Sequence, residues 1–192
     1  LTTALNQAKD ARQRLLEIGM ADLRRNQAEF VRVAKELDPQ QSTAQVLAGL
    51  VADQPPPAQL LEAFRANFDG LIDFLDTHPI ITVPSRVPPI LRETPPFMRA
   101  TTFASMDTPG PYEQQATEAY FYVTLPDPAW PAARIAGFMT QFNHSVISNV
   151  VVHEAYPGHH TELAIKDARL HRGEGKLEHS VVILNSPSCV VA

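Results

Sequence analysis

The first 76 residues carry apolar side chains at intervals of three and four, the spacing of one face of an α-helix. The clearest stripe lies between Pro57 and Asp76 and contains Leu61, Phe64, Phe68, Leu71 and Leu75. A similar stripe upstream contains Leu23, Phe30, Val31, Ala34 and Leu37, and Pro39 ends it because proline disfavours helix at the preceding residue. We therefore predict a helical region over residues 1–76, with these stripes packed between antiparallel helices.

Residues 77–130 follow a different pattern, because prolines recur throughout and exclude a continuous helix. Short apolar runs lie between the prolines, and the run from Ala119 to Leu125 is rich in β-forming residues. A segment of this length with aromatic content is typical of a packed functional insertion. We predict short β-strands within it.

Helical spacing returns at Pro131, a residue that suits the first turn of a helix. Apolar residues keep that spacing from Ile135 to Val151, which predicts one long helix at the centre of the core. The whole pattern indicates a mainly α fold with a proline-rich segment that contains short strands. We divide it into residues 1–76, 77–130 and 131–192, and expect these to form one incomplete domain.

Composition excludes several classes of function. The chain has 16 Lys and Arg against 21 Asp and Glu, a net charge of −5, and no basic cluster, which argues against nucleic acid as a partner. No apolar run approaches the roughly 18 residues of a membrane span. A single cysteine, Cys189, excludes an internal disulfide and a Cys-rich zinc module. The chain begins with Leu1, so a cytoplasmic or periplasmic location stays open, as does the oligomeric state.

One segment, His153-Glu154-Ala155-Tyr156-Pro157-Gly158-His159-His160, gathers three histidines and a carboxylate. Neutral imidazole suits zinc and similar divalent metals, and an adjacent Glu can take a proton from a metal-bound water. On an unbroken helix His159 and His160 would lie too far from His153 to share an ion. Pro157 and Gly158 can break the helix and bring one of the two back beside His153.

Two other interpretations fit the same residues. The segment can be the end of a helix in a binding or interaction module, with His159 and His160 capping carbonyls of the preceding helix. It can also hold a metal for storage or sensing without hydrolysis. The residues by themselves leave these alternatives open.

The eight residues from His153 to His160 closely resemble the motif of a bacterial family known as domain of unknown function 885, which is grouped with zinc metallopeptidases that carry H-E-x-x-H. The resemblance extends upstream to Thr82-Val83-Pro84, to the run from Glu93 to Ala100 and to the run from Tyr120 to Thr124. It covers residues 60–192 best and the helical beginning weakly.

The resemblance implies a helical metallopeptidase-like fold and a zinc ion, with His153 and His159 as ligands and Glu154 as general base. It leaves His160 as a second-choice ligand, and Tyr156 either orients substrate or packs. The sequence therefore favours a zinc-dependent metallohydrolase, above all a peptidase acting on a peptide substrate, in which Glu154 activates a metal-bound water.

Relatives carry a further carboxylate in a Glu-Gly-Trp segment beyond the histidines, and this sequence has no such segment. We therefore expect a fragment whose third ligand is missing and which is inactive by itself. Glu178 and His179 are the residues that could substitute for that ligand.

Overall fold

The computed structural model describes residues 2–83, 87–113 and 115–177. The chain forms two compact units, residues 1–52 and residues 53–192. The described part is mainly helical with one small three-stranded sheet, so the predicted fold class is confirmed. Within the described residues, no helix combines the length and apolar character that crossing a membrane requires.

The first unit is a pair of helices, α1 (Thr2–Leu37) and α2 (Thr43–Ala52), which pack against each other. Ser42 and Gln45 form a capping box at the start of α2: the Gln45 amide donates to Ser42 Oγ, and the Ser42 amide donates to Gln45 Oε1. The expected burial of the upstream stripe is wrong for most of its members, since Phe30 and Leu37 are 52% and 61% exposed while Ala34 is buried. The ten-residue α2 is too short to cover the 36-residue α1.

The second unit begins with a 3₁₀ turn, Pro57–Gln59, and α3 (Leu60–Thr77). Three short strands follow, β1 (Ile90–Glu93), β2 (Ala104–Asp107) and β3 (Tyr120–Val123). Four helical segments complete it: α4 (Ala132–Met139), α5 (His144–Glu154), α6 (His159–Ile165) and a π-helical stretch, Lys166–His171.

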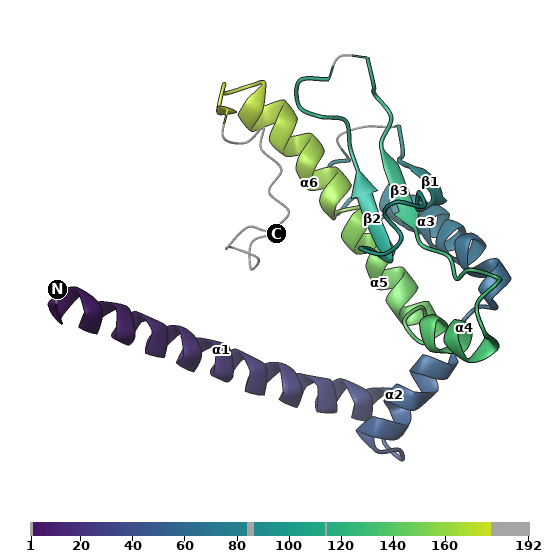
Figure 1. The fold of residues 1–192 in the computed structure, drawn as a ribbon, viewed down its shortest axis with the longest axis horizontal. Helices are drawn as coiled ribbons and strands as arrows, with labels where there is room; N and C mark the ends of the chain where they lie inside the picture. Colours follow the sequence, from purple (N-terminus) through teal and green to yellow (C-terminus); the bar gives the residue numbers. More distant parts are fainter. Residues whose placement is uncertain (1, 84–86, 114, 178–192) are drawn as a thin grey trace. The chain divides into compact units, whose positions relative to one another are not determined.

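The sheet has the order β1-β3-β2, with β1 parallel and β2 antiparallel to the central β3 (Figure 1). Phe121 of β3 lies opposite both Leu91 and Met106. It also contacts the rings of Phe64 and Phe68 on α3 edge-on, with centroids 5.9 and 6.4 Å apart. These phenylalanines join the sheet to α3 in the core, and α3 in turn packs against α5.

The predicted single helix from Pro131 to Val151 is wrong, because the structure has two helices separated at residues 140–143. Asn143 explains the second start: its side-chain oxygen accepts a hydrogen bond from the Val146 amide at 2.9 Å and caps α5. Phe142 beside it is fully buried. The helical spacing of apolar residues thus continues across residues 140–143, whereas the helical conformation of the backbone is interrupted there.

Candidate functional site

The His-Glu segment spans the end of α5 and the start of α6. The helix stops after Glu154, the Tyr156–Pro157 peptide bond is cis, and α6 begins at His159. Gly158 lies so close to α5 that a Cβ atom on it would stand 1.7 Å from the carbonyl oxygen of His153. Its amide donates to the carbonyl of Val152 at 3.1 Å, which fixes this approach. Only a residue without a side chain fits here.

The close approach of Gly158 to α5 places His159 beside His153. The two imidazole rings meet edge to face, with centroids 4.5 Å apart and planes inclined by 80°. His153 is exposed and His159 is half-buried, so both rings border solvent. The described residues contain no group of three or more His, Cys, Asp or Glu side chains that could hold a metal ion. His153 and His159 can supply two nitrogen ligands to a metal ion, and their exposure to solvent leaves room for further ligands.

Glu154 is the buried member of the segment, with 8% of its surface exposed. Burial raises the pKa of its carboxyl, while the neighbouring His159 and His153 and a hydrogen bond from the backbone amide of Met106 act in the opposite direction. Met106 belongs to β2, so the sheet as well as α5 positions the carboxylate. A carboxyl group with a raised pKa is a stronger base than an ordinary surface carboxylate.

Tyr156 and His160, at the junction of α5 and α6, are both buried. The Tyr156 ring is buried and stacks on Phe68, with centroids 6.1 Å apart, and burial raises the pKa of its hydroxyl. His160 stands edge-on to Tyr156 at 5.3 Å and is 7% exposed, and burial lowers its pKa. Neither ring nitrogen of His160 has a hydrogen-bond partner among the described residues.

Comparison with known proteins identifies the family. A family model described as "Bacterial protein of unknown function (DUF885)" matches residues 4–172. The chain belongs to the DUF885 family. A solved structure titled "The structure of a putative lipoprotein of unknown function from Shewanella oneidensis" shares the fold with a TM-score of 0.67 at 24% identity. The match covers 82% of the DUF885 chain and 29% of the Shewanella chain. Among curated proteins, none matches.

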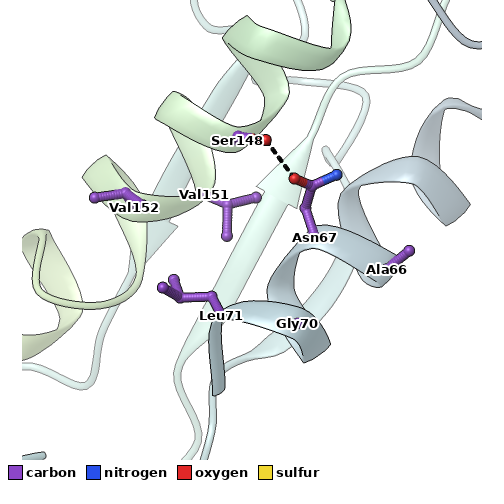
Figure 2. A pocket seen from close by; sticks show the side chains of 7 residues that line it. All are labelled: Ala66, Asn67, Gly70, Leu71, Ser148, Val151 and Val152. Atoms are coloured by element: carbon purple, nitrogen blue, oxygen red, sulfur yellow. Dashed lines mark hydrogen bonds between the residues drawn. The ribbon is translucent and has the colours of Figure 1, made fainter. Parts of the chain in front are cut away.

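The DUF885 chain also has a groove between α3 and α5, and its lining residues do not include His153 or His159 (Figure 2). Its volume is about 390 Å³, and Asn67 of α3 accepts a hydrogen bond from the Ser148 hydroxyl of α5 at its side. The lining residues are Ala66, Asn67, Gly70, Leu71, Ser148, Val151 and Val152. None of these carries an ionisable group, so the groove adds no acid, base or charged ligand to the site.

One functional contact had no signal in the sequence. The hydrogen bond from Met106 to Glu154 comes from a backbone amide, which any residue except proline supplies. The run Ala104–Asp107 has little β-forming character, so its sequence does not predict β2. The suggested substitutes Glu178 and His179, like the end of the segment 131–192, lie outside the described residues.

Proposed function

We propose that this DUF885 chain carries the metal-binding and proton-transfer residues of a zinc-dependent peptidase. The observation that carries the proposal is the contact of His153 with His159 directly beside a buried Glu154. A helix break built on Gly158 produces that contact. The similarity of the eight-residue motif to metallopeptidase motifs is what favours a peptide as the substrate.

The donor set fits zinc in its chemistry. Histidine nitrogens are ordinary zinc ligands, and two rings with centroids 4.5 Å apart are close enough to bind the same ion. His153 and His159 would hold the metal, and a zinc ion would supply Lewis acidity toward a peptide carbonyl. Two protein ligands are fewer than the three of usual catalytic zinc sites. We infer that a third ligand comes from outside the described residues.

Glu154 would act as the general base. Its raised pKa suits a group that must take a proton from the attacking water and later release it to the leaving amine nitrogen. Its side chain is buried, and the backbone amide of Met106 favours the charged form of the carboxylate. Glu154 lies next to His153 in the chain, so the base and the ligand pair move as one unit.

The role of His160 would be structural. His160 contacts Tyr156, and Tyr156 contacts Phe68 of α3. These contacts hold the segment between α5 and α6 against α3. A neutral imidazole is favoured there because burial lowers its pKa. His160 thereby supports the position of His159 without contacting an ion.

The experiment combines zinc analysis with peptide cleavage on the natural polypeptide that contains these 192 residues. The proposal predicts stoichiometric zinc, cleavage of a mixed peptide library and loss of cleavage with a chelator. Glu154→Gln should abolish turnover while zinc content and fold persist. Stoichiometric zinc without turnover on peptides would indicate a storage or sensing site. A folded protein with neither zinc nor turnover would indicate an interaction module. Each of these two results would contradict the proposal.

A further inference from the structure

A cluster of charged side chains lies at the end of the helical segment that begins with His159. The π-helical stretch Lys166–His171 follows α6 directly, and the Arg172 amide donates to the Asp167 carbonyl at 2.8 Å. Because a π-helix bonds residue i to residue i+5, the residues four and five positions after Asp167 both lie over its side chain. The Asp167 carboxylate accordingly accepts hydrogen bonds from His171 Nδ1 at 2.8 Å and from Arg172 Nε at 2.7 Å.

The His171 ring also contacts a tyrosine from the loop that follows β2. His171 is 8% exposed, and its bond to Asp167 fixes the orientation of the ring. Tyr112 stands edge to face with it, with centroids 5.0 Å apart and planes inclined by 84°. Tyr112 is 67% exposed and lies in a turn in which the Glu113 amide donates to the Gly110 carbonyl at 2.9 Å. A loop residue is therefore held against a buried, oriented imidazole.

This contact connects two segments that both start at the candidate site. One segment runs from Met106, whose amide bonds Glu154, to Tyr112, and two prolines restrict its backbone. The other is helical and runs from His159 to His171. The helical segment is about 18 Å long, and the loop segment reaches up to about 20 Å when extended. The two segments are thus linked at the site and again at their far ends.

We propose that the Tyr112–His171 contact holds β2 against the helical segment and so keeps the Met106 amide on the carboxylate of the general base. Tyr112 and His171 are then positioning residues, because they act through β2 and not on the reacting atoms. The effect on turnover rests on the proposed function. The hydrogen bond from Met106 to Glu154 exists without it and can be followed separately.

The first test measures hydrogen exchange of the Met106 amide in the zinc-free natural polypeptide, by mass spectrometry at residue resolution. An edge-to-face ring pair contributes a factor of about five to an equilibrium, so Tyr112→Ala should accelerate this exchange about fivefold. Tyr112→Phe keeps the ring and should exchange at the wild-type rate. The matched control is Phe97→Ala, which removes an 83% exposed ring from the loop before β2 and should change nothing. Circular dichroism verifies that the variants fold.

The second test measures peptide turnover and zinc affinity in the same variants. Tyr112→Ala should lower kcat by up to about fivefold, and Tyr112→Phe should restore it. KM and zinc affinity should stay at wild-type values, because β2 positions the base and supplies neither zinc ligand.

Wild-type Met106 exchange in Tyr112→Ala, or equally fast exchange in the alanine and phenylalanine variants, would overturn the assignment. Loss of zinc affinity in Tyr112→Ala would overturn it as well, since the contact would then act on the ligands. Absence of cleavage by the wild type would instead contradict the proposed peptidase, while Met106 exchange would still decide the role of the contact. The two failures are therefore distinguishable.

Discussion

Substitution of Gly158 by alanine tests the candidate site most specifically, because it adds one methyl group where residue 158 approaches the end of α5. That Cβ atom would stand 1.7 Å from the His153 carbonyl oxygen and 2.5 Å from that of Val152. Carbon and oxygen atoms approach to about 3.3 Å even in weak hydrogen bonds. The backbone at residue 158 must therefore move by roughly 1.6 Å, and His159 moves with it.

Two consequences follow from a displacement of this size. Overpacking of this kind costs about 3 kcal/mol in unfolding free energy, the upper end of its usual range. Metal ligands must be placed to within about 0.2 Å, so zinc affinity should fall by at least tenfold. Misplacement of a catalytic group by about 1 Å costs on the order of 100-fold in rate, which we expect in kcat/KM for peptide cleavage.

The control is Gly137→Ala on α4, where a Cβ atom would meet nothing within 4 Å. This exposed helical position should gain roughly 1 kcal/mol of stability from alanine and leave zinc binding unchanged. Urea unfolding gives the free energies, and competition with a chromophoric chelator gives the zinc affinities. Wild-type zinc affinity in a folded Gly158→Ala protein would contradict this prediction, since the close approach of Gly158 to α5 would then not be what positions His159.

Three further predictions concern single side chains. Burial raises the pKa of Glu154 in the folded protein, so its contribution to stability is full at low pH and is lost as pH rises through that pKa. Glu154→Gln should therefore raise the Tm of zinc-free protein more at pH 8 than at pH 4. A larger gain in Tm at pH 4 would contradict this. His159→Ala should weaken zinc binding at least tenfold while His160→Phe preserves it, and isothermal titration showing the reverse would make His160 the ligand. Asn143→Ala should cost about 1 kcal/mol in urea unfolding through loss of the α5 cap, whereas an unchanged midpoint would mean that the cap contributes nothing.

The sequence was most informative where one local rule decides the structure. The stripe from Leu61 to Leu75 predicts α3 because a buried helix face needs that spacing, and Phe64 and Phe68 are indeed in the core. Pro157 and Gly158 indicate the helix break for equally local reasons, and the structure has it at those residues. Such features depend on neighbouring residues and not on the tertiary fold.

Other features depend on contacts between distant segments, which no local pattern encodes. The approach of Gly158 to the His153 carbonyl selects His159 over His160 as the neighbour of His153, and the spacing left both open. β2 forms because β3 provides a pairing partner, although Ser105 and Asp107 are poor strand residues. The helix expected through Asn143 fails since a capping side chain competes there with an apolar pattern that continues unchanged.

The proposed peptidase depends on Glu154 acting as a base beside a zinc ion held by His153 and His159. The most direct test measures peptide turnover and zinc content together for the wild-type natural polypeptide and its Glu154→Gln variant. We expect equal zinc in both proteins, chelator-sensitive cleavage by the wild type and at least a 100-fold loss in kcat for the variant. Equal cleavage by both proteins would contradict it.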